Sequence, residues 1–570
     1  MKDLRLYRVA FAPALAALVV LAFSLGSAPE PVEPPGGTLE FDPSAAMKSA
    51  RDVLALGDSR EAGSETDDAA ADLVAERFGA IVSGTVTEQV VEAEIEGSEA
   101  ELRNVILTLP GASDRAILLV AGRDSREGAG APSSAAATGM LLALADELAV
   151  AQRQRTLILA STSGASAEAE GARELISALP DRTTVDAVIV ISQPGFDEPF
   201  GPHVVTSAGG HGPPVGLART AEEVLQDRAG LSAGTTGALA QIARYAVPAA
   251  AGEQAALIDE GQQAVALSSA GELPVPPEDS ASDRLSSETV DVFGQTLLAL
   301  VAALDAATDA PASGQGSFLW VGENLVPGWS VAVIVLALLL PPLALSASLL
   351  ARAHRGGDRL GQTFGWAAEW WLPAAVVCAG LYGLALAGVI PGSDVPYDPA
   401  RYELGVGEAA MLVLLVALAI WLWWVIGLRR MPPNQRPRAL GAASGLLAVV
   451  ACVLVWIANA YLALVLLPLA HLVAVLGTSG RRPAALAVPL LVLGTVPLAA
   501  ATIYVASALD WGSSTPWQLA VLVGGGGFQV LQVVGGFLFV ASVAGVLTAA
   551  LATARASSRE ELRVAPSDRA

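Results

Sequence analysis

The sequence predicts two structural parts, an α/β domain and an all-helical domain that spans a membrane. Strand-like and helical segments alternate between residues 44 and 307. This pattern is typical of a three-layer domain with a mostly parallel sheet. Long apolar runs follow Pro327, and arginines gather in every second loop between those runs. That distribution is expected of a chain that crosses a membrane several times.

The first segment is an apolar run at residues 9–25, which follows Lys2, Arg5 and Arg8. Its length is close to what a transmembrane helix needs. A basic start followed by an apolar run is also typical of a secretory signal peptide. We expect a retained anchor over residues 1–28, with a cleaved signal peptide as the alternative. In both cases the residues that follow lie outside the cytoplasm.

A Pro- and Gly-rich linker over residues 29–43 leads into the α/β domain, which we expect over residues 44–308. Short apolar runs bounded by turn residues indicate buried strands, and helical periodicity indicates covering helices. The expected strands are residues 90–95, 104–109, 116–120, 156–160, 187–191 and 264–268. The expected helices are residues 45–56, 67–78, 134–149, 167–179, 215–226, 237–245 and 287–303. A domain of this length can bury one large core.

A second linker over residues 309–327 precedes the membrane domain, residues 328–553, and a cytoplasmic tail, residues 554–570. The membrane domain contains apolar runs at residues 329–350, 370–390, 409–428, 439–457, 461–476, 484–509 and 521–552. Asn459 marks a tight turn between two of them. The last run is longer than one span needs. The glycines at 524–527 leave open whether it forms one span or two.

The loop charges predict the topology. Arginines follow the first, third, fifth and seventh apolar runs, and acidic residues dominate the loops between. Cytoplasmic loops are enriched in Lys and Arg, so the pattern predicts eight spans, including the N-terminal one, with both termini in the cytoplasm. The arginines are Arg352, Arg355, Arg359, Arg429, Arg430, Arg436, Arg438, Arg481, Arg482, Arg555, Arg559 and Arg563.

Composition argues against several classes of function. The formal net charge is -23, and nucleic-acid binding depends on neutralising phosphates with basic residues, so we expect no nucleic-acid partner. Cys378 and Cys452 both lie in apolar runs, so the α/β domain has no disulfide and no thiol chemistry. The sequence also contains neither a nucleophile elbow nor a phosphate-binding glycine loop.

Four segments of the α/β domain occur in the order seen in a known enzyme family. They are REAGS at 60–64, RNVI at 103–106 leading to LPG at 109–111, AGRDS at 121–125, and LIDEG at 257–261 followed by AVALS at 264–268. Together they resemble the co-catalytic zinc aminopeptidases, a family that includes aminopeptidase S, aminopeptidase Y and glutamate carboxypeptidase. The resemblance implies an aminopeptidase-style fold with its site at the carboxyl ends of the strands.

The resemblance also assigns the metal-binding positions, and this chain lacks the family's ligands at each of them. The family holds two zinc ions with imidazole and carboxylate ligands and uses a glutamate as general base. The matching positions are Gly122 for the first histidine, Ser133 and the three residues after it for the bridging aspartate, Ala165 and Ser166 for the paired glutamates, Ser192 for the next aspartate, and Val275 or Pro276 for the last histidine. Asp124 is retained, but in the family it only orients the histidine.

Other ionisable residues of the α/β domain have simpler interpretations than catalysis. His203 and His211 could form a new metal site with Asp197 or Glu198, but Pro and Gly around them favour a surface loop. Asp124 suits a turn or helix-capping role. Glu168 and Glu170, near the lost glutamates, suit the solvent-exposed face of a helix.

The apolar runs contain few polar residues that could support transport. His471 lies in the middle of a run, and Glu369 lies near the end of one. A single histidine is most simply a contact between helices, and Gln529 and Gln532 are expected to hydrogen-bond between helices. A proton- or ion-coupled transporter would need more buried charge.

We therefore expect a non-catalytic multi-pass membrane protein without a metal cofactor. Its peptidase-like domain would bind a peptide or protein partner outside the cytoplasm or act as a scaffold subunit. An N-terminal span, an aminopeptidase-like domain without zinc ligands and a helical bundle are also similar in layout to the GPI-transamidase attachment subunit, which is an analogy of architecture. The alternatives are an active membrane-bound zinc aminopeptidase with displaced ligands and a transporter with a soluble domain.

Overall fold

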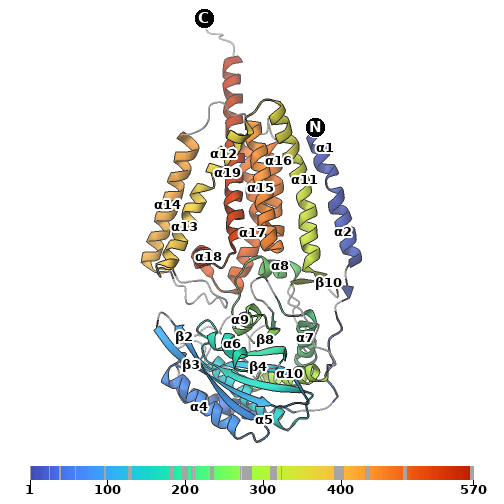
Figure 1. The fold of residues 1–570 in the computed structure, drawn as a ribbon, viewed down its shortest axis with the longest axis vertical. Helices are drawn as coiled ribbons and strands as arrows, with labels where there is room; N and C mark the ends of the chain where they lie inside the picture. Colours follow the sequence, from blue (N-terminus) through green and yellow to red (C-terminus); the bar gives the residue numbers. More distant parts are fainter. Residues whose placement is uncertain are drawn as a thin grey trace.

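An α/β domain and a C-terminal helical bundle lie end to end along the long axis of the computed structural model (Figure 1). The structure describes residues 2–24, 26–27, 29–36, 40–57, 59–95, 98–125, 131–179, 184–195, 203–206, 210, 212–230, 237–269, 271, 285–307, 317–321, 324–390, 404–429, 437–478 and 484–564.

The α/β domain is built on a seven-stranded sheet with the order β2-β3-β5-β4-β6-β8-β7. Its strands are β2 (Thr85–Ile95), β3 (Ser98–Leu109), β4 (Ser113–Gly122), β5 (Arg155–Thr162), β6 (Thr184–Ser192), β7 (His203–Val205) and β8 (Ala264–Ser268). The central strands β5, β4, β6 and β8 are parallel, whereas β2, β3 and β7 pair antiparallel with their neighbours. The expectation of a mostly parallel sheet is therefore correct only for the centre. The β2–β3 connection is a hairpin, too short for a parallel crossover.

Helices cover both faces of the sheet, as the three-layer prediction requires. One face carries α3 (Pro43–Leu54), α4 (Glu65–Gly79), α5 (Ala131–Val150), α7 (Val215–Ala229) and α10 (Ser287–Ala306). The other carries α6 (Glu170–Glu174), a 3₁₀ turn at Leu175–Ala178 and α9 (Glu253–Asp259). Alternate residues of β4 divide between the two cores: Ile117 and Leu119 pack on the α5 face, and Leu118 and Val120 on the α6 face. A central strand buried on both faces explains its uninterrupted apolar run.

The expected helix at residues 167–179 is shorter in the structure. Glu168 and Ala169 adopt left-handed backbone angles, with φ of 63° and 55°. An α-helix cannot run through two left-handed residues, so α6 begins only at Glu170 and passes into the 3₁₀ turn.

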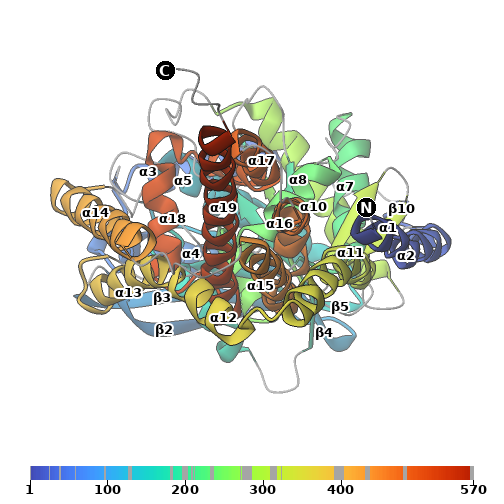
Figure 2. The ribbon, with the colours of Figure 1, turned by 90° about the horizontal axis from the view of Figure 1, so that it is seen from above.

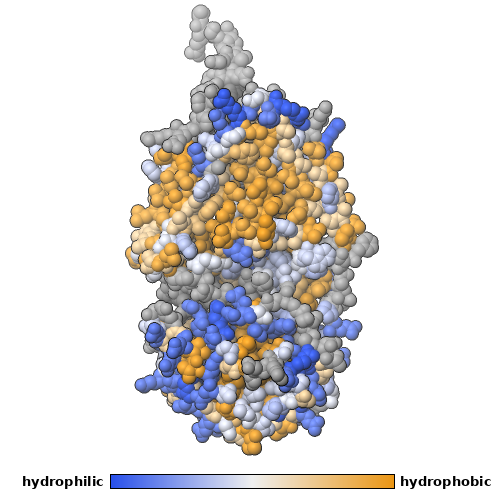
Figure 3. Space-filling model, in the orientation of Figure 1, coloured by the Kyte–Doolittle hydropathy of each residue, from blue (hydrophilic) through white to orange (hydrophobic). Residues whose placement is uncertain are grey.

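The helical bundle corresponds to the seven apolar runs. It comprises α11 (Gly328–Arg355), α12 (Leu360–Glu369), α13 (Leu372–Leu386), α14 (Val406–Arg429), α15 (Pro437–Ala458), α16 (Ala460–Gly477), α17 (Ala484–Ala508), α18 (Thr515–Gly524) and α19 (Val530–Val564). Among the described residues, nine helical segments are long and apolar enough to cross a membrane, and two of them belong to α5 and α10 of the α/β core. On the face shown in Figure 3, a broad hydrophobic surface covers the bundle, which is compatible with a membrane protein.

The last apolar run is divided. Helix α18 ends at Gly524 and α19 begins at Val530. Gly526 lies between them with a φ of 93°, a conformation that favours glycine. Gln529 and Gln532 occupy the start of α19, where Gln532 Oε1 accepts a hydrogen bond from Gln529 N at 2.8 Å. Among the described residues, this glutamine pair thus makes a local hydrogen bond at the helix start, whereas hydrogen bonds between helices were expected.

The N-terminal segment packs along α11 as α1 (Lys2–Val9) and α2 (Ala12–Ser24), at the margin of the bundle opposite α13 and α14 (Figure 2). Tyr7 Oη and His471 Nδ1 lie 2.7 Å apart and share a hydrogen bond, and the Phe11 ring stacks on His471. The interpretation of His471 as a helix–helix contact is confirmed.

A small sheet joins the ends of the first and second apolar helices of the chain. Strand β1 (Gly26–Ser27) pairs with β10 (Asn324–Pro327), which pairs with β9 (Phe318–Val321). The expected linker at 309–327 is therefore partly a pair of antiparallel strands, and one apolar residue from each strand, Leu319 and Val326, is buried in the core of the bundle.

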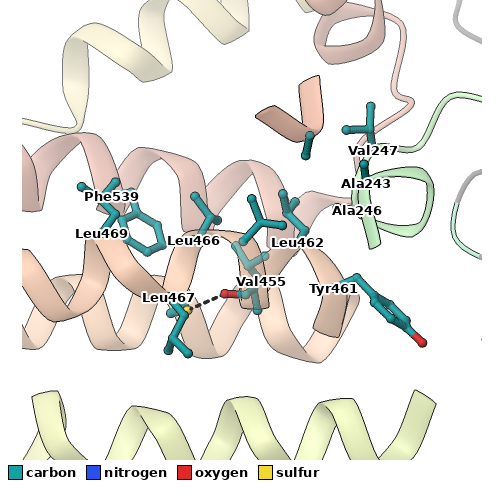
Figure 4. Packing of buried hydrophobic residues seen from close by; sticks show 14 of the residues in the cluster. Ala243, Ala246, Val247, Val455, Tyr461, Leu462, Leu466, Leu467, Leu469 and Phe539 are labelled. Atoms are coloured by element: carbon teal, nitrogen blue, oxygen red, sulfur yellow. Dashed lines mark hydrogen bonds between the residues drawn. The ribbon is translucent and has the colours of Figure 1, made fainter. Parts of the chain in front are cut away.

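Helix α8 (Ala238–Ala246) was expected to cover the sheet, but it lies against α16 and α17 of the bundle (Figure 1). The Tyr245 and Tyr461 rings stack 4.8 Å apart, and Asn459 Nδ2 donates to Tyr245 O at 2.7 Å. Figure 4 shows Ala243 and Ala246 on the side of α16 that carries Leu462. The sequence pattern correctly predicts an amphipathic helix, but its apolar side packs on the bundle.

Candidate functional site

The candidate site lies where the central strands β4 and β5 end. Gly122 is the last residue of β4 and pairs in register with Thr162, the last residue of β5. The segment 123–125 follows one strand, and the loop at 163–169 follows the other. The carboxyl ends of adjacent parallel strands are where α/β domains usually place their ligands and reacting groups.

Asp124 fastens the loop that follows β5. Its Oδ1 accepts a hydrogen bond from Ala165 N at 2.8 Å. Its Oδ2 accepts from Ser166 N at 2.8 Å and from Ser166 Oγ at 2.6 Å. The side chain is buried, with Asp124 3% exposed. Asp124 therefore has the turn-stabilising role that its residue type favours.

The loop held by Asp124 fills the space beside Gly122. A Cβ atom built on Gly122 would lie 2.3 Å from Ala165 Cβ and 3.2 Å from Glu253 Oε2. The first of these distances is far below van der Waals contact. Glycine at position 122 is thus required by the present position of Ala165, and no larger side chain fits there unless the loop moves.

Glu253 is a site residue that the sequence reasoning missed. It opens α9, and its carboxyl group is enclosed beside Gly122. Thr162 Oγ1 donates to Glu253 Oε1 at 2.6 Å, and Gly122 N–H also stabilises the carboxylate. Burial raises the pKa of Glu253 to about 7; the Thr162 hydrogen bond opposes that rise and nearby Asp124 adds to it.

The sequence carries one weak signal for Glu253. It stands between two alanine-rich stretches, at 249–251 and 255–256. A lone carboxylate in such surroundings is either a helix-start residue, which favours the helix dipole, or a buried group. The segment that resembles the aminopeptidases, residues 257–268, begins four residues after Glu253.

Arg123, in the segment 123–125 that follows β4, forms a buried ion pair. Arg123 Nε lies 2.9 Å from Asp67 Oδ1, and both side chains are essentially inaccessible to solvent. Arg123 Nη1 also donates to Ser161 O at 3.2 Å. Burial raises the pKa of Asp67, and the charge of Arg123 opposes that rise. The pair anchors the start of α4 to the ends of β4 and β5.

Arg60 ties a third element to the same region. Its Nε donates to Arg123 O at 3.2 Å, and its Nη2 donates to Ser134 Oγ at 2.6 Å in the first turn of α5. Arg60 also pairs with Ser125 in an isolated antiparallel bridge. Alternate residues of segment 122–125 thus have different roles. Gly122 and Asp124 contact the 163–166 loop, whereas Arg123 pairs with Asp67 of α4 and Ser125 pairs with Arg60.

The structure brings together only some of the positions that the sequence resemblance assigned to the site. Gly122, Asp124, Ala165 and Ser166 form one contiguous group with Glu253. Ser133 is buried in the first turn of α5, and its hydroxyl has no hydrogen-bond partner among the described residues. Ser192 ends β6 and pairs in register with Ser268 of β8. Val275, like His211, Asp197 and Glu198, lies outside the described residues.

His203 lies in the edge strand β7, not in the expected loop, and pairs in register with Ser268. Burial lowers the pKa of His203. In the described part of the chain, no group of three or more His, Cys, Asp and Glu side chains is arranged to hold a metal ion.

Comparison with known proteins gives structural neighbours only. No protein-family model matches the chain, and no curated protein matches it. The neighbours include glutaminyl cyclase from Porphyromonas gingivalis (17% identity, TM-score 0.35), which covers 46% of this chain and 99% of its own. A Zn-dependent exopeptidase from Parabacteroides distasonis (14%, TM-score 0.37) covers 46% of this chain and 98% of its own. A zinc aminopeptidase from Bacillus subtilis (11%, TM-score 0.38) covers 49% and 98%. These similarities are at low identity and span about half the chain.

Proposed function

We propose that this chain is a non-catalytic membrane protein whose α/β domain binds a peptide or protein partner outside the cytoplasm, or holds one as a scaffold subunit. The observation that carries the proposal is the packing around Gly122. The 163–166 loop, fastened by Asp124, occupies the space beside the end of β4 where a metal-binding side chain would have to project.

The chemistry of the donors supports the same conclusion. Zinc in hydrolytic sites is held by imidazole, thiolate or carboxylate ligands. Glycine, alanine and serine stand at the assigned positions of the Gly122 group, and Asp124 already accepts three hydrogen bonds. Glu253 is paired with Thr162. These residues do not fit a two-zinc centre, so we derive no hydrolytic step for them.

The junction with the bundle supports a scaffold role. The segment that joins α8 to α9 packs on both parts of the molecule: Ala249 and Ala251 belong to the core of the bundle, and Ala250 belongs to the core of the α/β domain. Glu253 follows two residues later. A connection that packs on both parts fixes the orientation of the α/β domain on the bundle. A protein that presents a partner at a membrane surface needs such a fixed orientation.

The membrane setting rests on the apolar helices together with the loop arginines. In the described part of the chain, seven candidate spans lie in the bundle, and the arginine-rich loops support a cytoplasmic position for every second connection. The α/β domain would then lie on the extracytoplasmic side.

A peptidase assay tests the proposal. Full-length protein, purified in detergent and supplied with zinc, is incubated with a panel of aminoacyl-p-nitroanilides. We expect no hydrolysis above that of a mock preparation. Turnover that disappears with a chelator and returns with zinc would overturn the proposal in favour of an active aminopeptidase with displaced ligands. The Asp124→Ala variant is the matched comparison, because activity that belongs to this site must change when the loop is released, whereas activity from a contaminating peptidase stays the same.

A further inference from the structure

The β2–β3 ribbon forms one margin of the sheet. β2 stands at one end of the strand order, so among the described residues one of its edges has no strand neighbour. β3 pairs with β5 only over residues 105–109, whereas it pairs with β2 along its whole length. The ribbon therefore projects beyond the central sheet, at the margin below α13 and α14 (Figure 1). Hydrophilic residues gather on that margin (Figure 3).

The free edge of β2 lacks most of the features that usually prevent another strand from pairing. Edge strands are commonly short, or are interrupted by proline, lysine or a bulge. β2 has 11 residues, contains neither proline nor lysine, and stays in continuous register with β3. Val90 is 59% exposed on it. What β2 does carry is glutamate, which opposes pairing with another acidic strand but not with a basic one.

The ribbon also places like charges directly opposite each other. Glu92 is the register partner of Glu101, and Glu99 lies two residues from Glu101 on the same face of β3. Side chains in such cross-strand positions interact, and like charges there are destabilising. Glu92, Glu99 and Glu101 are exposed. An acidic tip of this kind is stabilised when a cation binds beside it.

Arg103 of β3 is the nearby cation, but it lies at the base of the ribbon and is already surrounded by acidic side chains. Arg103 lies 2.8 Å from Glu88, 3.0 Å from Asp72 and 3.5 Å from Asp68. These ion pairs do not extend to Glu92, Glu99 or Glu101. The surface formed by β2, the ribbon tip and the adjoining start of α4 thus keeps an excess of negative charge.

We propose that the free edge of β2 accepts an extended basic segment of a partner protein as an eighth strand of the sheet. Main-chain hydrogen bonds to the β2 edge would supply affinity, and alternate side chains would supply specificity. Because side chains alternate between the faces of a strand, arginine or lysine of the partner lies opposite Glu88 and Glu92, and an apolar residue lies opposite Val90. This inference rests on the proposed function, since it names the class of partner.

A peptide-binding experiment tests the inference on the full-length protein in detergent. The probe is a fluorescein-labelled synthetic peptide. Every second residue is threonine, and the residues between the threonines are arginine, valine and arginine in that order. A second peptide has glutamate for arginine, and a third is N-methylated along one backbone edge. We expect the first peptide to bind, with an affinity that falls several-fold as salt is raised. The glutamate and N-methylated peptides should bind at least about tenfold more weakly, because they lose charge complementarity or one row of hydrogen bonds.

A protein variant with matched charge changes locates the site. Glu92→Gln, Glu99→Gln and Glu101→Gln together should weaken binding of the arginine peptide about tenfold. The control combines Asp146→Asn, Glu223→Gln and Asp227→Asn, which remove three exposed charges elsewhere and should leave binding within about twofold. Failure of the arginine peptide to bind, equal binding of the N-methylated peptide, or equal losses in the two variants would each overturn the inference. None of these results would restore a zinc peptidase, so the proposed function and the inference fail separately.

Discussion

Asp124 and Ser166 are joined by two hydrogen bonds, from Ser166 N at 2.8 Å and from Ser166 Oγ at 2.6 Å to the same carboxylate oxygen. This contact joins the turn after β4 to the loop after β5. That loop contains two consecutive left-handed residues, Glu168 and Ala169, an arrangement that costs free energy and persists only when neighbouring contacts impose it. Asp124 supplies such contacts, so the stability of the site depends on it.

Asp124→Ala should destabilise the α/β domain. The substitution removes three hydrogen bonds and leaves the N–H groups of Ala165 and Ser166 without their acceptor, which costs about 2–3 kcal/mol. Thermal unfolding of the purified protein measures the loss. The control is Asp114→Ala, at an exposed position of β4. Equal melting of the two variants would show that Asp124 does not hold the loop.

Gly122→His should not create a metal site. The new Cβ would lie 2.3 Å from Ala165 Cβ, and forcing extra atoms into a packed region costs about 1–3 kcal/mol or more. We expect a lower unfolding temperature and no gain in zinc binding. Adding Ala165→Gly should recover part of the lost stability, because it removes the atom in the closest contact. If Gly122→His melts as the wild type does, the packing described around Gly122 is wrong.

Glu253 makes stability depend on pH in a defined direction. Burial raises the pKa of Glu253 from 4.5 to about 7, so the folded protein holds this proton more tightly than the unfolded chain. The resulting stabilisation is complete below about pH 4.5 and is lost as pH rises through about 7. The charged group that faces Glu253 is Asp124; Arg173 of α6 contacts Glu260 at the other end of α9.

Glu253→Gln keeps an oxygen that can accept from Thr162 but cannot ionise. We expect the variant to lose this part of the pH dependence and to be more stable than the wild type above pH 7 by roughly 2 kcal/mol. Unfolding temperatures measured from pH 5 to 8 provide the comparison. Parallel pH profiles for the two proteins would rule out Glu253 as the titrating group.

The Arg123–Asp67 pair should show strong coupling. Replacing Arg123 alone with methionine leaves a buried carboxylate without its cation, which costs about 3–5 kcal/mol. Replacing both residues, as Arg123→Met with Asp67→Leu, should cost less than the single change at Arg123. A double-mutant cycle of unfolding free energies measures the coupling. Additive effects would mean that the pair does not act as a unit.

Much of the fold follows from local pattern. The central strands could be predicted because strands buried on both faces need uninterrupted apolar runs, as at residues 116–120 and 187–191. β2 is longer than expected because its first half, Thr85 to Gln89, is rich in polar residues that face solvent or α6. The position of α8 could not be predicted, since amphipathicity shows that a helix has a buried side but not which element covers it.

The candidate site was predictable only in part. The end of β4 and the role of Asp124 follow from a polar turn after a buried strand. The contact between Gly122 and Glu253 joins residues 131 positions apart in sequence, and neither carries a motif that marks the other. This contact exists only because the fold brings the ends of β4 and β5 next to the start of α9.

We infer that protein atoms fill the end of β4 and leave no room for a metal ion there. The most direct test is the zinc content of the full-length protein after equilibration with excess zinc and removal of unbound metal, determined by elemental mass spectrometry. We expect a zinc content near zero per chain, unchanged in Asp124→Ala. One or two zinc ions per chain, lost when Asp124 is replaced, would contradict it.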